Sequence, residues 1–198
     1  MSLRLSYTLL APFYDWIARP AFAAARARSL AHLPREGGCR VLLNGVGTGL
    51  DLAHVPASHQ YVALDLTRAM LRRAMGRANR LDMHWVEGDS LALPFAGSCF
   101  DYAVLHLILA VVSDPARALR ETARVLRRGG VVLILDKFLR EGERAPLRRL
   151  VSPLAARIAT RTDLEFERAL ARAPALKLVD DAPAFGGGWF RLVRLVKE

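Results

Sequence analysis

The stretch Val41-Leu42-Leu43-Asn44-Gly45-Val46-Gly47-Thr48-Gly49 decides the fold of this 198-residue chain. An apolar run of strand length stops at three glycines that are spaced two residues apart. A second apolar run, residues 61–64, leads into Asp65. A strand, a glycine turn and a second strand that ends in a carboxylate are typical of a site for a nucleoside-bearing cofactor. Glycine lets the backbone approach such a ligand closely, and the carboxylate is placed to accept hydrogen bonds from ribose hydroxyls.

The spacing of the glycines separates two classes of cofactor. A dinucleotide fingerprint reads G-x-G-x-x-G, so its third glycine would stand at position 50. That position is Leu50, and Gly49 comes one residue early, which gives G-x-G-x-G. The pattern therefore argues against a dinucleotide.

Apolar runs and turn residues along the chain predict strands that alternate with helices. We expect strands at about residues 39–45, 60–65, 84–87, 100–105 and 131–135, with helices at 68–80 and 114–126 and a short one after Gly49. This alternation predicts βαβ units and a mostly parallel sheet. Residues 176–179 and 189–196 are predicted as two last strands, which pair antiparallel because no helix separates them. Residues 1–35 are predicted to be helical up to Pro34.

Composition bounds the class of protein. With 53% hydrophobic and 24% charged residues, the chain is predicted to be a folded globular protein and not a disordered one. No apolar run approaches the roughly 18 to 20 residues of a membrane span, and polar residues interrupt the N-terminal stretch where a signal peptide would lie. We therefore expect a cytoplasmic protein. Cys39 and Cys99 lack metal-ligand spacing, and no metal site is expected.

The net charge of +10 comes almost wholly from arginine. A GC-rich coding sequence would give this bias without any functional demand, but the charge would equally attract nucleic acid or an anionic membrane. We do not expect nucleic acid as a partner, because the sequence has no appended binding module and no aromatic stacking motif. The oligomeric state is left open.

Three further motifs follow the glycine turn in a recognisable order. Residues 63–71 read Ala-Leu-Asp-Leu-Thr-Arg-Ala-Met-Leu, and residues 88–95 read Gly-Asp-Ser-Leu-Ala-Leu-Pro-Phe. Residues 114–130 contain Asp-Pro, Arg-Glu, Arg-Val-Leu and Gly-Gly in sequence. With these four motifs in register over residues 39–136, half of the chain resembles the class I S-adenosylmethionine-dependent methyltransferases. It is most similar to the type 11 group, which includes ubiquinone and menaquinone methyltransferases.

This resemblance implies a fold and a cofactor. The fold would be α/β, a single Rossmann-like three-layer sandwich over residues 1–198, with a seven-stranded mostly parallel sheet and an antiparallel C-terminal hairpin strand. Residues 1–35 would form a helical lid, residues 39–136 the cofactor-binding core, and residues 137–198 the substrate-side helices and the hairpin. The cofactor would be S-adenosyl-L-methionine.

The resemblance also implies which residues of the glycine turn bind the cofactor. Gly45, Gly47 and Gly49 would face its methionine and ribose parts. Asn44 stands where the family usually has Glu or Asp near the charged methionine moiety. A neutral amide can still form a hydrogen bond there, but it loses the charge-assisted part of the contact.

The remaining implied cofactor residues stand at or just after the next strand ends. Asp65 would bind the ribose hydroxyls, and Leu66 would pack on the adenine. Asp89 would accept a hydrogen bond from the adenine amino group, with Ser90 beside it. His106 would lie near the sulfonium or the substrate, although an isolated histidine in an apolar run is also typical of a core residue.

Methyl transfer from a sulfonium is an in-line displacement in which the protein mainly aligns the nucleophile and excludes water. A general base is needed only if the acceptor must lose a proton. The candidate bases are Tyr7, Tyr14, Asp15, His106 and Lys137. A lid formed by the N-terminal helices favours Tyr14 and Asp15, but core packing explains the two tyrosines equally well, so the catalytic residue is left open.

The methyl acceptor is left open between a lipid or prenylated quinone and another small molecule. Residues 11–15, Ala-Pro-Phe-Tyr-Asp, and residues 111–115, Val-Val-Ser-Asp-Pro, resemble segments of small bacterial phosphatidylethanolamine N-methyltransferases. A helix that carries Trp16, Phe22 and several arginines could lie on an anionic bilayer, at the inner face of the membrane. The third alternative is a binding protein with a methyltransferase fold that has lost its cofactor, which Asn44 would allow.

Overall fold

The computed structural model describes residues 22–138, 164–185 and 188–198. A seven-stranded sheet has the strand order β3-β2-β1-β4-β5-β7-β6. The strands are β1 (Arg40–Asn44), β2 (Gln60–Asp65), β3 (Asp82–Glu87), β4 (Phe100–His106), β5 (Leu126–Lys137), β6 (Leu176–Phe185) and β7 (Phe190–Lys197). Strands β1 to β5 pair in parallel, whereas β7 pairs antiparallel with both β5 and β6. The predicted α/β fold, with its mostly parallel sheet and antiparallel C-terminal hairpin, is confirmed.

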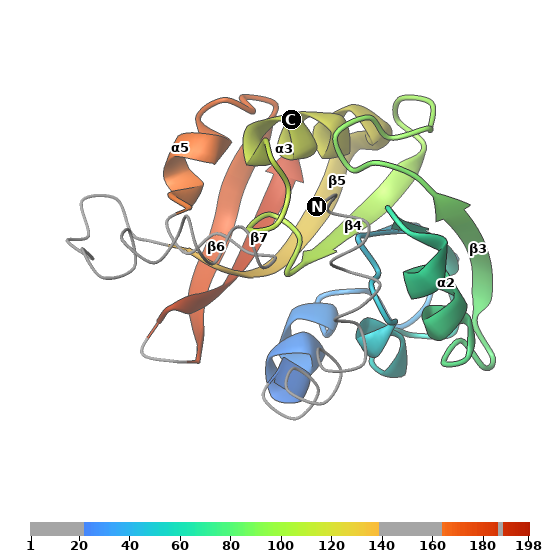
Figure 1. Ribbon diagram of the computed structural model, residues 1–198. Helices are drawn as coiled ribbons and strands as arrows, with labels where there is room; N and C mark the ends of the chain where they lie inside the picture. The colour runs from blue at the N-terminus through green and yellow to red at the C-terminus, as the bar shows by residue number, and fades with distance from the viewer. Residues whose placement is uncertain (1–21, 139–163, 186–187) are drawn as a thin grey trace.

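Helices cover both faces of the sheet and complete a three-layer arrangement (Figure 1). On one face lie α3 (Pro115–Val125) and α5 (Phe166–Leu170), which share a hydrophobic core with β4 and β5. On the other face lie the helical residues 22–30 and α2 (Arg68–Met75), which form a second core with β1 and β2. The short helix expected after Gly49 is the 3-10 helix η1 (Leu50–Ala53).

The apolar run that opens the glycine motif is the central strand β1. Leu42 belongs to the core on one face, and Val41 and Leu43 belong to the core on the other. A parallel strand that is buried on both faces reads as a continuous apolar run. This double burial explains why the run shows no polar alternation.

Two predicted helix ends are wrong. Helix α2 ends at Met75 and not at residue 80, because Gly76 forms its C-terminal cap and Arg80 has a positive φ of 75°. Helix α3 ends at Val125, and Leu126 already pairs with Phe100 as the first residue of β5. The ladder then shifts its register before Val131 pairs with Tyr102. Residues 127–130 are therefore an irregular part of a strand and not a loop after the helix.

The predicted strand at residues 176–179 is also too short, since β6 continues to Phe185 along its partner β7.

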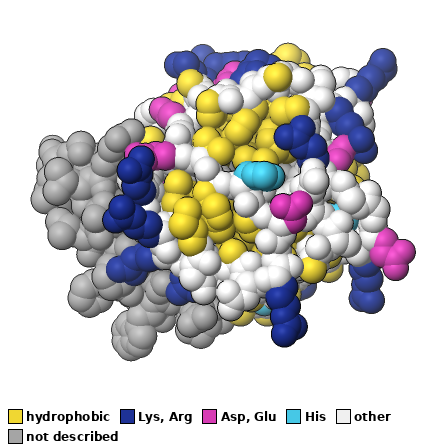
Figure 2. Space-filling model, turned by 90° about the vertical axis from the view of Figure 1, so that its right-hand side faces the viewer, with side chains coloured by type: hydrophobic (Ala, Val, Ile, Leu, Met, Phe, Trp, Pro, Cys, Tyr) yellow, Lys and Arg dark blue, Asp and Glu magenta, His cyan; other side chains and the backbone are white. Residues whose placement is uncertain are grey.

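The side of the molecule that carries β3 and α2 shows a central group of hydrophobic side chains with arginine and lysine side chains around it (Figure 2). Within the described residues, no helix is long and apolar enough to cross a membrane. Residues 1–21 of the expected lid and residues 139–163 of the expected substrate-side region lie outside the described residues.

Candidate cofactor and acceptor site

The three glycines of the turn have different surroundings. All have left-handed backbones, with φ of 76° at Gly45, 55° at Gly47 and 81° at Gly49. A Cβ atom on Gly45 would lie 2.7 Å from Cδ1 of Ile108, and one on Gly49 would lie 2.9 Å from Cα of Ala74. A Cβ on Gly47 would meet nothing within 4 Å. Packing therefore requires Gly45 and Gly49, whereas the space beside the Gly47 Cα is open.

Asp65 is fixed in place at the end of β2 by backbone donors. Its Oδ2 accepts a hydrogen bond from the Gly47 N–H at 2.9 Å, and its Oδ1 accepts one from the Thr67 N–H at 3.1 Å. Burial raises the pKa of Asp65, while these hydrogen bonds oppose the rise. Oδ1 also lies 3.5 Å from the Thr67 hydroxyl, whereas Oδ2 has only the Gly47 donor among the described residues and is able to accept a further hydrogen bond from a hydroxyl group. Leu66 is half-buried beside Asp65.

Asn44 connects the end of β1 to the segment that follows β3. Its side chain is buried, and its Oδ1 accepts a hydrogen bond from the Ser90 hydroxyl at 2.6 Å. Its Nδ2 is also buried and has no hydrogen-bond partner in the described part of the chain. Asp89 is exposed, and its Oδ1 accepts from the Leu91 N–H at 2.8 Å. A buried donor without a partner is costly, so Asn44 fits beside an acceptor group of a ligand.

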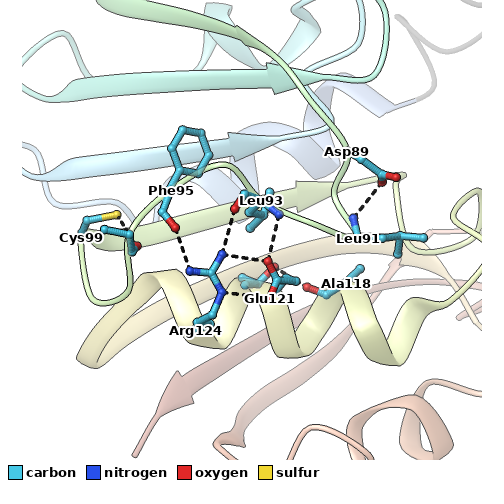
Figure 3. Close-up of polar contacts among 10 residues, drawn as sticks. Asp89, Leu91, Leu93, Phe95, Cys99, Ala118, Glu121 and Arg124 are labelled. Carbon is cyan, nitrogen blue, oxygen red and sulfur yellow. Dashed lines mark hydrogen bonds and ion pairs between the residues drawn. The ribbon is translucent and has the colours of Figure 1, made fainter.

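Glu121 and Arg124 on α3 hold the segment that carries Asp89 and Ser90 (Figure 3). Glu121 Oε2 accepts from the Leu93 N–H at 2.9 Å, and Arg124 donates to the carbonyls of Leu93 at 2.9 Å and Phe95 at 2.7 Å. The two side chains also bond each other, and Arg124 holds the pKa of Glu121 below its usual value. The Arg-Glu and Arg-Val-Leu motifs of the sequence thus have a positioning role that sequence reasoning did not assign.

His106 ends β4 in a buried polar network. Its Nδ1 lies 2.7 Å from Asp51 Oδ1, and its Nε2 lies 2.9 Å from the hydroxyl of Ser29. Arg26 Nη1 donates to the same Asp51 oxygen at 2.7 Å. Burial alone would raise the pKa of Asp51, but His106 and Arg26 outweigh it and hold that pKa below its usual value. The carboxylate therefore orients the imidazole with an Nδ1 proton toward Asp51, and Nε2 shares a hydrogen bond with the Ser29 hydroxyl.

The structure thus brings part of the expected site together directly. Asn44 bonds Ser90, and Gly47 bonds Asp65, at the carboxyl ends of neighbouring strands. His106 is connected instead to the helix at residues 22–30 and to η1. Sequence reasoning missed Asp51, whose only signal was an acidic residue two positions after Gly49.

Two other strand-end groups are relevant to the site. Asp136 was not among the candidates, yet it is buried at the end of β5, and burial raises its pKa to about 6. Its Oδ2 accepts from the Ala110 N–H at 3.1 Å, so it holds the loop after β4 in place.

Of the other candidate bases, Lys137 is half-buried, whereas Tyr7, Tyr14 and Asp15 lie outside the described residues. Among the described residues, no group of histidine, cysteine and acidic side chains is arranged to hold a metal.

Comparisons with known proteins agree with this geometry. A methyltransferase domain family matches residues 42–134. A phosphatidylethanolamine N-methyltransferase of Cereibacter sphaeroides is 32% identical over 190 residues, which cover 93% of each chain. A demethylmenaquinone methyltransferase of Renibacterium salmoninarum is 36% identical over 100 residues, 50% of this chain and 41% of that one. The solved structure of an S-adenosylmethionine-dependent methyltransferase of Thermotoga maritima superposes with a TM-score of 0.70 at 20% identity, over 100% of both chains.

Proposed function

The chain belongs to the S-adenosylmethionine-dependent class I methyltransferases, and we propose that it methylates the amine of phosphatidylethanolamine or a closely similar aminophospholipid. The observation that carries this proposal is the extent of the similarity to the Cereibacter enzyme, which covers 93% of each chain. It therefore includes segments on both sides of the cofactor core. The similarity to the demethylmenaquinone enzyme covers only half of this chain, so it gives much weaker support for a quinone acceptor.

The cofactor-binding roles are part of the proposal. Gly47 would border the methionine and ribose parts, because its N–H is held by Asp65 and the space beside its Cα is open. Asp65 would accept from the ribose hydroxyls, mainly through Oδ2, which has one donor among the described residues. Gly45 and Gly49 would act indirectly by letting the turn pack on the neighbouring segments.

The adenine side of the proposed cofactor site comes from the ends of β2 and β3. Leu66 would pack on the ring, and Asp89 would accept from its amino group. Ser90 would hold Asn44 with its Nδ2 free to donate to the methionine moiety. The bound cofactor would supply an activated methyl group on a sulfonium.

The protein's own part in the reaction is alignment, exclusion of water and removal of one proton. An ammonium must lose a proton before it can act as a nucleophile, so this acceptor requires a general base. Both ring nitrogens of His106 already have partners, which argues against this residue as the base. We therefore assign that role to Tyr14 or Asp15 and give His106 a positioning role.

The test is transfer of a radiolabelled methyl group from S-adenosylmethionine to defined acceptors. Vesicles of phosphatidylethanolamine mixed with an anionic lipid are expected to yield labelled phospholipid, and vesicles with demethylmenaquinone are expected to yield none. Asp65→Ala should lose activity together with calorimetric binding of the cofactor. Labelled quinone with unlabelled phospholipid would overturn the acceptor assignment and leave the family membership intact.

The same vesicles test the expected peripheral contact with the membrane. Because the acceptor is a bilayer lipid, the protein must reach the bilayer surface, and its net charge of +10 favours an anionic surface. We expect co-sedimentation with anionic vesicles and its loss at high salt. Equal recovery in the supernatant with neutral and anionic vesicles would contradict this contact.

A further inference from the structure

A group of aromatic side chains lies at the carboxyl edge of the sheet, beside the proposed cofactor site. The Phe22 ring lies 4.8 Å from that of Phe185 and 4.9 Å from that of Phe190, and the last two rings stack at 4.4 Å. Trp189 adds a fourth ring 6.0 Å from Phe190. These four residues, the aromatic cluster, join the helix at residues 22–30 to the facing ends of β6 and β7, and all are half-buried.

Lys137 lies directly beside this aromatic cluster. It is the last residue of β5 and pairs in register with Phe190 of β7, so the two side chains share one face of the sheet. Leu133, four residues earlier on β5, belongs to the core on that face, where the helix at residues 22–30 also packs. Lys137 and the aromatic cluster thus lie together on the side of the sheet that the N-terminal helix covers.

The Lys137 ammonium forms no ion pair with a carboxylate in the described part of the chain. Burial lowers its pKa, and the charge of the neighbouring Asp136 only partly opposes this shift. The Asp136 side chain lies on the opposite face of the sheet from Lys137, because neighbouring residues of a strand alternate between faces. Its carboxylate accepts from the N–H groups of Ala110 and Lys137. The nearby acids Asp181 and Glu167 are both bonded to Arg191, which shares the face of Asp136.

A second cation lies on the β6 side of the aromatic cluster, across from Lys137. The guanidinium of Arg28 lies 3.4 Å from the carbonyl oxygens of Pro183 and Ala184, immediately before Phe185. Two positive side chains therefore flank an aromatic surface. Because a half-buried ammonium is stabilised by an anion, the arrangement fits an amphipathic ligand with an anionic group.

The strand order gives the distance scale of the site. Strand β5 is the second neighbour of β1, so their ends are about 10 Å apart. The proposed cofactor lies at the end of β1, and β4 lies between the two. In an ethanolamine headgroup, two carbon atoms separate the amine from the phosphate. This spacing leaves room for the methyl donor, the amine and the phosphate in a row along the edge.

We propose that Lys137 binds the phosphate of the phospholipid acceptor and that the aromatic cluster contacts its glycerol and acyl parts. The proposal rests on the proposed function and adds the group that distinguishes a phospholipid from a neutral quinone. Arg28 adds a positive charge on the other side of the aromatic cluster. Lys137 is thus a specificity-determining residue, and the general base lies elsewhere.

The experiment compares Lys137→Met, Lys137→Arg and the matched control Lys177→Met, whose lysine is exposed on β6 and paired with Glu198. Methyl transfer to phosphatidylethanolamine in mixed micelles gives KM and kcat. Losing a charge-assisted hydrogen bond should raise KM about 10- to 100-fold in Lys137→Met, with kcat within about twofold. Arginine should restore KM to within about fivefold, because it keeps the charge, and Lys177→Met should match the wild type.

A binding measurement separates this proposal from the proposed function. Soluble glycerophosphoethanolamine is titrated into the protein in the presence of S-adenosylhomocysteine, and its affinity is measured by NMR. The wild type should bind it, and Lys137→Met should bind at least about tenfold more weakly. If phosphatidylethanolamine is not methylated but this difference persists, the acceptor assignment fails and the phosphate subsite stands. Equal KM and equal affinity in wild type and Lys137→Met would overturn the subsite.

Discussion

The Nδ1 atom of His106 lies 2.7 Å from Oδ1 of Asp51, and this contact joins the end of β4 to the helix that follows the glycine turn. Arg26 reaches the same oxygen from the N-terminal helix. Replacing Asp51 with Asn should destabilise the protein by about 3–5 kcal/mol, because it removes the carboxylate charge that is paired with the buried Arg26 guanidinium. Urea unfolding monitored by circular dichroism measures this loss. Arg28→Ala on the same helix is the control and should cost under about 1 kcal/mol.

The contact between His106 and Asp51 also predicts how the free energy of unfolding depends on pH. The pKa of Asp51 is lower in the folded protein than its usual value of 3.8, so its ionisation favours folding. The stabilisation is present above pH 4 and is lost as the pH falls below that value. The difference in unfolding free energy between wild type and Asp51→Asn should therefore shrink from pH 6 towards pH 3. A constant difference over that range would show that the carboxylate charge is not what holds the network.

Asp136 should have the opposite pH dependence. Burial raises its pKa from 3.8 to about 6, so the folded protein holds this proton more tightly than the unfolded chain does. Relative to Asp136→Asn, the wild type should lose about 2 kcal/mol of stability as the pH rises from 4 to 7. Urea unfolding of both proteins across this range gives the difference. A wild type that gains stability over Asp136→Asn as the pH rises would contradict the assignment.

Arg124 should affect cofactor binding without contacting the cofactor. Its loss frees the carbonyls of Leu93 and Phe95 and loosens the segment that carries Asp89 and Ser90. Arg124→Met should cost only about 1 kcal/mol of stability, since the side chain is 40% exposed. Calorimetry should show S-adenosylhomocysteine binding weakened by about 3- to 10-fold. Arg117→Met, at an exposed position of the same helix, should bind like the wild type.

The parts of the fold that follow from short-range patterns were predictable from the sequence. The glycine turn, Asp65 and the strand runs are contiguous, and buried parallel strands are readable as apolar runs. The bond between Arg26 and Asp51 was not predictable, because it joins residues far apart in the chain whose charges look like ordinary surface charges. The C-terminal end of α3 was predicted wrongly for a similar reason. The helix ends because Leu126 pairs with Phe100 in the sheet, and not because of Gly129 and Gly130.

The glycines of the turn give the sharpest test of the site, because the structure assigns them different roles. Gly47→Ala adds a methyl group where nothing lies within 4 Å, so its stability cost should be only the left-handed backbone, about 1–2 kcal/mol. Because that methyl group would occupy the proposed cofactor space, S-adenosylhomocysteine binding should weaken at least about tenfold.

Compared with Gly47→Ala, Gly45→Ala should lose more stability and less affinity for S-adenosylhomocysteine. Its methyl group would clash with Ile108, which adds about 1–3 kcal/mol to the same backbone cost. Combining Gly45→Ala with Ile108→Ala should recover part of the packing loss, whereas Gly47→Ala has no such partner. Thermal unfolding and calorimetry of Gly47→Ala, Gly45→Ala, Ile108→Ala and the double variant separate stability from affinity. Equal affinity losses in Gly45→Ala and Gly47→Ala, after correction for the unfolded fraction, would refute the assignment of Gly47 as the ligand-facing glycine.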